Sequence, residues 1–440
     1  MNAVSYIEHY QAVSLALPGR QLAWLNALRE EALANFSGSG FPSPREEEWK
    51  YTNVSPIEKK LFKPLIGQAS YADSPNRDWL DSYRLADAWT LVVVDGHFFR
   101  DLSALEGIPE GVIASGLAET LEKHPERVEA CLGTVCSKEK HGFIAFNTAF
   151  FSDGVFVDVP ADVALEKPLQ LIYISTRPEG LSNTRSIIAL GENARASVVE
   201  TYAGSADQAY LTAAVTEVRV GGNAELDLYK VQSESDKAFH FGGIYVVQER
   251  SARFQQHNVA FGGLLVRNEI HTELRKGAEC LMSGLFLASR RQHVDNHTLI
   301  HHAEPYGVSR EVYRGILADR ARGVFQGRIV VHPDAQKTDA EMNNRNLLLS
   351  EDAEIDTKPQ LEILADDVKC AHGVTVGQLD PESVFYLESR GVDEQSARNM
   401  LTFAFAHSMV EKIALDSLRA LVQTQLLNLF PQAGIRRDWL

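Results

Sequence analysis

The sequence predicts a mainly β fold whose core is a parallel β-helix, with helical regions before and after it. Two observations predict this fold. From 143 to 377, β-branched residues alternate with polar ones, and Gly and Asn stand at the corners. Within this stretch one short pattern recurs seven times: mostly polar or Gly residues, a small residue, a charged residue and a β-prone run. The small position falls at Ala194, Ala224, Ala252, Ala278, Ala321, Ala353 and Val368.

The irregular spacing of this pattern favours a β-helix over other solenoids. Most intervals between small positions are 26 to 32 residues, one of 43 is long enough to hide a second turn, and one is 15. Leucine-rich and ankyrin repeats keep strict periods instead. Short strands cannot bury an apolar face alone, so we expect neighbouring coils to stack into one continuous core.

Residues 1–142 are predicted to be mostly helical, with one short β-hairpin. Leucines at helical spacing predict a helix within Leu15–Phe36. The strand Leu91–Val94 precedes an Asp-Gly turn, which is typical of a hairpin. A further helix is expected over 117–132. We interpret the polar cluster Arg45–Thr52 as a solvated loop with two aromatic anchors.

Residues 378–440 are predicted to be helical again. Asp380 before a proline is typical of an N-cap with proline in the first turn. Gly391 lies just after the expected end of this helix, where a residue in the left-handed conformation is common. Asp393 caps a second helix, expected over 394–430. Its apolar residues are too many for one core-facing stripe. Either this helix is buried on two sides within the protein, or part of it contacts a partner.

Composition and charge exclude several classes of protein. The 440 residues are 45% apolar and 23% charged, an ordinary globular balance. The formal charge of −16 argues against a nucleic-acid binder. No stretch approaches 18 apolar residues, so no membrane span is expected, and the first twenty residues do not resemble a secretory signal. Four scattered cysteines favour a reducing cytoplasm over a disulfide framework.

Motifs of several enzyme classes are missing from the sequence. It contains no GxxxxGK[ST], GxGxxG, HExxH, GxSxG or CxxC pattern. This argues against an autonomous ATPase, a zincin, a serine hydrolase or a dithiol oxidoreductase. Cys131 and Cys136 carry no recognised ligand spacing, and Cys280 is expected to pack in the core, so no role is assigned to these three.

Cys370 and His372, in the last repeat, form the sharpest candidate site. Residues i and i+2 of a strand share a face, with Cα atoms roughly 6.6 Å apart, close enough to ligate neighbouring atoms of a cluster. Their companions Val368, Val374 and Val376 are apolar, so both side chains are expected to point into the solenoid. They are either ordinary core residues or ligands at the final coil, where the interior becomes accessible or meets another molecule.

A second candidate is the set His293, Asp295 and His297, which continues to His301. These residues share one face of a predicted strand, and imidazole and carboxylate together can bind a divalent metal. Polar residues on the solvated face of a strand produce the same pattern, so both interpretations remain open.

Several longer motifs strongly resemble the SufB/SufD family of iron-sulfur cluster assembly proteins. Residues 47–52 are similar to the N-terminal region of its SufD members, and the Cys-x-His-Gly run at 370–373 resembles SufD rather than SufB, which typically has Glu in the fourth position. The remaining motifs lie within Tyr313–Gly377 and are Gly327–Val331, Lys337–Asp339, Asn343–Ser350 and Thr357–Ile363.

The resemblance implies a right-handed parallel β-helix between helical domains, serving as a non-catalytic scaffold. Such a scaffold acts with SufB and the ABC ATPase SufC to assemble a nascent cluster from iron and persulfide sulfur and to transfer it. Cys370 and His372 match the family's Cys and His at the interface with SufB, so they are implied ligands of iron or of a transient, shared cluster. ATP turnover would belong to SufC, and this chain would bind no nucleotide.

The expected contacts follow from that arrangement. SufB should bind the end of the β-helix, and SufC should bind the C-terminal helices at 381–390 and 394–430. The isolated chain is expected to carry no stoichiometric cluster and to form at most a weak homodimer. Three alternatives remain: the SufB-type paralogue, a mononuclear metal oxidoreductase using His293, Asp295 and His297, and a polysaccharide-active β-helix enzyme, which would need paired carboxylates on one face.

Overall fold

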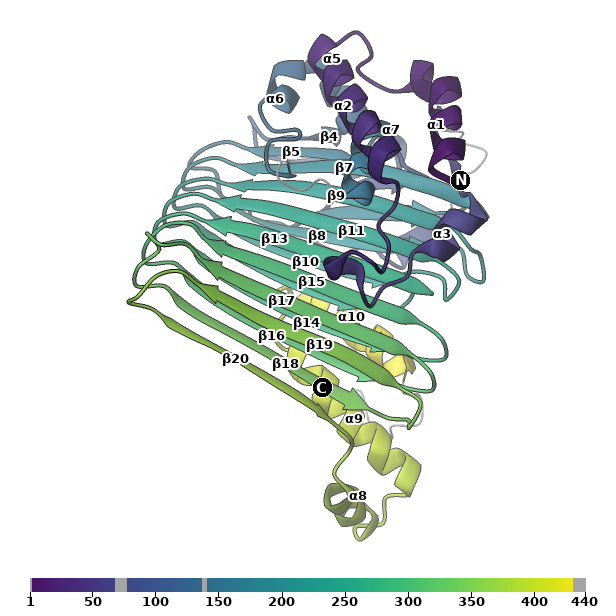
Figure 1. Ribbon diagram of the computed structural model, residues 1–440, viewed down its shortest axis with the longest axis vertical. Coiled ribbons are helices and arrows are strands. Elements are labelled where there is room, and N and C mark those ends of the chain that lie inside the picture. The colour runs from purple at the N-terminus through teal and green to yellow at the C-terminus, as the bar shows by residue number, and fades with distance from the viewer. Residues whose placement is uncertain (1, 68–76, 137–140, 430–440) are drawn as a thin grey trace.

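Two parallel sheets form the core of the computed structural model, which describes residues 2–67, 77–136 and 141–429. Each coil contributes one strand to each sheet, and about eight coils stack along one axis (Figure 1). The predicted fold, a mainly β solenoid flanked by helices, is confirmed. No helix in the described residues is long and apolar enough to cross a membrane.

Odd-numbered strands form most of one sheet, called sheet A here. From β5 to β19 its strands pair in parallel, whereas β4 joins it antiparallel and β1 pairs with β7 alone. Its members are β1 (Lys63–Pro64), β4 (Ile113–Gly116), β5 (Val155–Val159), β7 (Gly180–Leu190), β9 (Leu211–Val220), β11 (Phe239–Gln248), β13 (Leu265–Leu274), β15 (His293–His302), β17 (Arg322–Val331) and β19 (Glu354–Ile363).

Even-numbered strands form the other sheet, called sheet B here. Its strands pair in parallel from β2 to β20, and β3 closes a hairpin on β2. Its members are β2 (Trp89–Val94), β3 (His97–Phe98), β6 (Leu169–Ser175), β8 (Arg195–Gly204), β10 (Glu225–Ser233), β12 (Arg253–Ala260), β14 (Glu279–Ala288), β16 (Val308–Leu317), β18 (Asp339–Leu348) and β20 (Lys369–Gly377).

The recurring pattern marks the corners of the solenoid. Its small residues from Ala194 to Ala353 are buried, and the charged residue after each begins a strand. Asn193 and Asn223 have φ of 58° and 55°, a left-handed conformation that Asn tolerates. The uneven intervals also have a simple origin. A coil is about 30 residues long. The interval of 43 is about one and a half coils, so it moves the pattern from sheet B to sheet A, and the interval of 15 is half a coil, so it moves the pattern back to sheet B.

The N-terminal region is helical, but two helices differ from the prediction. The helix expected within Leu15–Phe36 begins at Ala23, and the helix expected over 117–132 is two, because Pro125 lacks an N–H and disfavours helix at the residue before it. The predicted hairpin is confirmed. The helices are α1 (Asn2–Val13), η1 (Ser14–Ala16), α2 (Ala23–Ser39), η2 (Glu47–Trp49), α3 (Ser55–Lys60), α4 (Arg77–Asp81), η4 (Arg100–Leu102), α5 (Leu117–Lys123), α6 (Pro125–Glu129) and α7 (Gly142–Phe150).

Helix α7 lies where the first strand of the solenoid region was expected. All nine of its residues are buried, and it packs between α2 and sheet A. Figure 1 shows this helical region at the end of the solenoid where β4 and β5 lie. The boundaries 1–142, 143–377 and 378–440 remain predictions, although β2 and β4 already belong to the two sheets.

The C-terminal caps are confirmed. The Asp380 carboxylate accepts from two backbone N–H groups of α8 (Pro381–Glu388), Asp393 caps α9 (Glu394–Val410), and Gly391 has a φ of 89°. The second predicted helix is divided, because the chain turns after α9 and continues as α10 (Asp416–Leu429). Residue 430, its expected end, lies outside the described residues.

Helices α9 and α10 pack on the outer face of sheet B. Phe403, Met409 and Val422 are buried there, together with Tyr229 and Leu285 of the sheet. Burial within the protein therefore accounts for part of their wide apolar surface, while Met400, Leu401 and Phe405 remain only partly buried and Ala404 is exposed. Helix α8 differs, because it projects beyond the β20 end of the solenoid (Figure 1).

One buried carboxyl makes stability depend on pH. Glu311 of β16 is 1% exposed, and burial raises its pKa to about 7, although Thr298 offsets part of this effect. In the unfolded chain the pKa is lower, so the free energy of unfolding should fall as pH rises from about 4.5 to 7, by roughly 3 kcal/mol, and then level off.

Replacing Glu311 by Gln should remove this slope. We expect the free energy of unfolding of Glu311→Gln, measured with urea, to exceed that of the parent chain by more at pH 8 than at pH 5. The matched control is Glu341→Gln on the next strand of sheet B, whose side chain is 59% exposed. An equal difference between Glu311→Gln and the parent at both pH values would contradict the assignment.

Candidate functional site

The last strand places the first candidate pair at the open end of the solenoid. Cys370 lies beside Ala340 and His372 beside Met342, through parallel pairing of β20 with β18. Ala340 and Met342 are core residues, so Cys370 and His372 share the inward orientation that the sequence predicts. Cys370 is partly buried against this core, whereas His372 is exposed because no further coil covers it.

This end of the solenoid combines unpaired strand edges with apolar side chains. Among the described residues, β19 and β20 each pair with one strand only and so end their sheets. Leu364 is 61% exposed, and Ile363 and Val376 are 42% and 47% exposed. An edge of this kind can accept a further strand, and exposed apolar patches commonly mark interaction sites.

The thiol of Cys370 is held in its neutral form in the isolated chain. Burial raises its pKa, and nearby Asp339 adds to this, while a hydrogen bond from the Ala340 backbone opposes it. A thiol binds metal as the thiolate, so ligation would release a proton.

The second candidate set lies beneath the N-terminal segment. Asp295 and Thr52 are buried, and the Thr52 hydroxyl donates to Asp295 Oδ2 at 2.5 Å and lies 2.9 Å from His293 Nε2. This face of β15 is therefore not solvated. The interpretation of residues 45–52 as a solvated loop with aromatic anchors agrees with the structure at these positions: residues 45–48 are exposed, whereas the anchor Trp49 is 2% exposed and has the Arg267 guanidinium 3.6 Å from its ring centroid.

Arg267 is the centre of a buried ion-pair network. It lies 2.7 Å from Glu269 and 2.6 Å from Asp295, and it donates to the backbone oxygen of Glu48 at 3.0 Å. Burial alone would raise the pKa of Asp295, but His297 and Arg267 outweigh it and lower this pKa. Since the carboxylate of Asp295 is already bound, His293, Asp295 and His297 do not converge on a metal position. Within the described residues no group of three or more His, Cys, Asp or Glu does.

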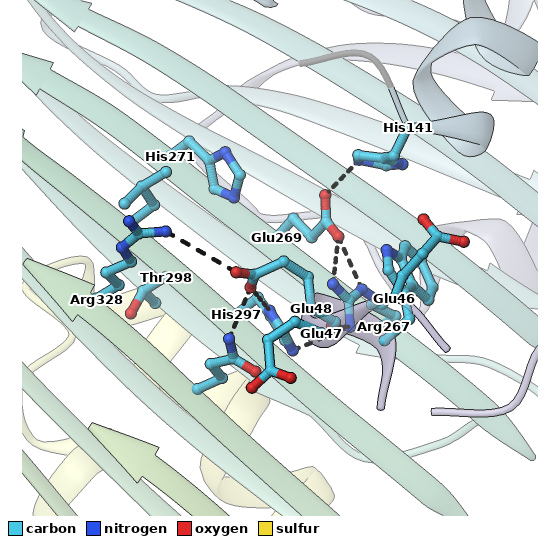
Figure 2. Close-up of a pocket in the computed structure, with 13 residues that line it drawn as sticks. Glu46, Glu47, Glu48, His141, Arg267, Glu269, His271, His297, Thr298 and Arg328 are labelled. Carbon is cyan, nitrogen blue, oxygen red and sulfur yellow. Dashed lines mark hydrogen bonds and ion pairs between the residues drawn. The ribbon is translucent and has the colours of Figure 1, made fainter. Parts of the chain in front are cut away.

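A cavity of about 280 Å³ lies between this network and η2. Figure 2 shows Glu48 reaching from η2 towards His297 and Arg328, while His141 bonds Glu269 on the other side at 2.9 Å. Its lining residues are Glu46, Glu47, Glu48, Trp49, His141, Arg267, Glu269, His271, His297, Thr298, Leu299, Gln326 and Arg328.

Sequence analysis did not single out Arg267, Glu269 or His141. One signal was available, because Arg267 and Glu269 lie on the same face of β13 and charged side chains need partners if that face is covered. One such partner is the backbone oxygen of Glu48, which lies 219 residues before Arg267 in the sequence. No local pattern reveals a contact over such a separation.

The other three cysteines have structural surroundings. Cys280 is buried in the core, as expected. Cys136 is also buried, and the Arg185 guanidinium donates to its sulfur at 2.7 Å. Burial raises the pKa of the Cys131 thiol, which is half-buried.

Comparison with known proteins gives matches over nearly the whole chain. The family model for the SufBD core domain of the SUF iron-sulfur cluster assembly system matches residues 173–405, and that for the SufBD N-terminal region matches 1–171. The iron-sulfur cluster assembly protein SufD of Escherichia coli is 30% identical, over 91% of this chain and 92% of its own length.

Two further SufBD and SufD proteins are also similar to this chain over most of their length. A SufBD family protein of Synechocystis is 29% identical over 89% of this chain and 88% of its own length. The SufD protein of Bacillus subtilis is 25% identical over 90% of this chain and 92% of its own length.

The buried network should matter for stability more than surface ion pairs do. Arg267→Met leaves Asp295 and Glu269 without their shared cation, so we expect the free energy of unfolding, measured with urea, to fall by about 3–5 kcal/mol. Arg253→Met, which removes a half-exposed pair with Glu279, should cost under about 1 kcal/mol. Similar losses in the two variants would show that the network is not a centre of stability.

Proposed function

Because the chain belongs to the SufBD family of iron-sulfur cluster assembly proteins, we propose that it is a SufD-type scaffold subunit. In this role it joins a SufB-type β-helix protein and a SufC-type ABC ATPase, and the three assemble a nascent cluster and pass it on. The cytoplasm is the proposed location, as expected from the few scattered cysteines.

The observation that carries this proposal is the position of His372. It is an exposed imidazole on an inward-facing register position of the last strand, beside the partly buried Cys370. A second solenoid that adds a strand to β19 or β20 would place its own side chains next to this pair. The site is then shared, and neither chain completes it alone.

The chemistry of the pair suits iron. Thiolate and imidazole are both ligands of iron and of iron-sulfur clusters. The raised pKa of Cys370 keeps it protonated until a metal or sulfur species displaces the proton. In this proposal the pair holds a cluster transiently and together with the partner, so the isolated chain should hold no stoichiometric cluster.

Catalytic turnover belongs to the partner in this proposal. The sequence lacks the phosphate-binding loop of an ATPase, so ATP hydrolysis is assigned to the SufC-type subunit. A mononuclear oxidoreductase centred on Asp295 loses support, because Arg267 and His297 already occupy that carboxylate.

Within the C-terminal helices expected to bind the ATPase, we propose α8 as the main contact. Much of the apolar surface of α9 and α10 packs on sheet B, including Phe403, Met409 and Val422. Phe385 and Tyr386 of α8 are 70% and 57% exposed, and exposed aromatic side chains of this kind are typical anchors of an interface. Deleting both later helices would uncover sheet B, so point variants in α8 give the cleaner test.

The first test concerns His372. His372→Ala should still co-purify with the SufB-type and SufC-type subunits, but cells that depend on it should lose activity of iron-sulfur enzymes under iron limitation. The matched control is Lys369→Ala, an exposed residue of the same strand with opposite orientation. Normal enzyme activity in the His372→Ala strain would remove this residue from the site.

The second test concerns α8. The double variant Phe385→Ser and Tyr386→Ser should weaken ATPase binding by about thirtyfold or more, the effect of losing a hot spot worth about 2 kcal/mol. Binding to the SufB-type subunit should be unchanged. Tyr306→Ser, which alters a residue 58% exposed at a distant corner, serves as control. Unchanged ATPase affinity in the double variant would place docking elsewhere.

A further inference from the structure

Two arginines face each other on the outer face of sheet B. Arg314 of β16 and Arg345 of β18 are register partners and share the outward orientation. Like charges directly opposite each other on adjacent strands are destabilising. Other arginines on this face lie opposite carboxylates instead, with nitrogen–oxygen distances of 3.3, 3.0 and 4.0 Å in the pairs Arg195–Glu225, Arg253–Glu279 and Arg310–Glu341.

A third cation lies beside this pair. Lys412 belongs to the turn between α9 and α10, and the next residue, Ile413, packs in the same apolar cluster as Leu285, the register partner of Arg314 on β14. The charges affect one another: burial and then Arg345 lower the pKa of Arg314, while burial and then Arg314 lower the pKa of Lys412. Three positive charges therefore gather over β16 and β18.

No described carboxylate neutralises the two arginines. The Arg314 guanidinium donates to the backbone oxygen of Phe405 at 2.6 Å, and that of Arg345 donates to the side-chain oxygen of Asn343 at 3.1 Å. Neither arginine forms an ion pair with a described residue. Their other neighbours on this face are uncharged, namely Leu285, Val312, Ile316, Leu347 and Thr375.

Lys412 also forms no ion pair within the part of the chain that the structure describes. The carboxylate next to it in sequence, that of Glu411, lies 3.8 Å from His407 Nδ1. Lys412 and Arg345 are exposed and Arg314 is half-buried, so a dissolved anion can reach the cluster. The chain has a formal charge of −16, so carboxylates are abundant, and three adjacent cations without one indicate an external anion.

We propose that Arg314, Arg345 and Lys412 bind a phosphate group, either the free ion or a phosphomonoester. Such a group carries roughly two negative charges and three acceptor oxygens, so it can accept from all three cations at once, whereas a carboxylate has only two oxygens. Guanidinium groups also match the geometry of phosphate oxygens. Because the arginines lie on sheet B and Lys412 in the α9–α10 turn, bound phosphate would tie the C-terminal helices to the solenoid. Neither point depends on the proposed function.

Calorimetric titration of the full chain tests the site. Inorganic phosphate and methyl phosphate are titrated separately in chloride buffer at constant ionic strength, and at least one should bind saturably. Arg345→Gln and Lys412→Gln should each weaken binding by about tenfold or more, the effect of losing one hydrogen bond to a charged group. The matched control is Arg253→Gln on the same face, which should leave the affinity unchanged. The tighter ligand of the two identifies the free ion or the phosphomonoester as the better source.

Stability without phosphate gives a second measurement. Arg345→Gln relieves the repulsion with Arg314, so this variant should unfold at a higher urea concentration than the parent in chloride buffer of low ionic strength. Added phosphate should then stabilise the parent more than the variant. Absence of saturable binding of both ligands to the parent, parent-like affinity in Arg345→Gln and Lys412→Gln, or a lower urea midpoint of Arg345→Gln without phosphate would overturn the proposal.

Discussion

Parallel pairing between successive coils is the constraint on which the rest of the structure depends. Each strand from β5 onwards receives its hydrogen bonds from the strands of neighbouring coils, in unbroken register. A solenoid built in this way satisfies the backbone hydrogen bonds of every interior strand but leaves one edge of each strand in its last coil unpaired. The position of β20 at that end explains why Cys370 is partly buried while His372, with the same orientation, is exposed.

The outer surfaces of the two sheets are covered in different ways. Apolar side chains of α9 and α10 cover sheet B. Sheet A is covered near its middle by η2, where Trp49 packs on Arg267 and the carboxylates of Asp295 and Glu269 share one guanidinium. Burying a charge is costly unless it is paired, so covering this face required the ion-pair network.

Histidine side chains on the outer face of sheet A thus have different surroundings along a single strand, β15. Asp295 and His297 are enclosed, and both contact the Arg267 guanidinium. His301, four residues further along the strand, is half-buried and forms a hydrogen bond with His332 instead. Burial and the presence of a cation thus make Asp295 and His297 part of a structural cluster.

The sequence by itself determined the features that depend on local interactions. The corner residues Ala194 and Asn193, the hairpin turn and the cap Asp380 each act on neighbouring backbone, so their positions were predictable. The motif at 370–373 and its inward orientation were predictable for the same reason, since alternation along a strand is local.

Only the tertiary structure decided which outward faces are covered. The contact between Glu48 and Arg267 joins segments 219 residues apart, and that between His301 and His332 arises from strand register across a coil. It also decided which apolar residues of α9 are buried against sheet B and that exposed aromatic residues remain on α8. Contacts of this kind depend on how the coils stack and what packs on them, which the spacing of residues along one segment does not encode.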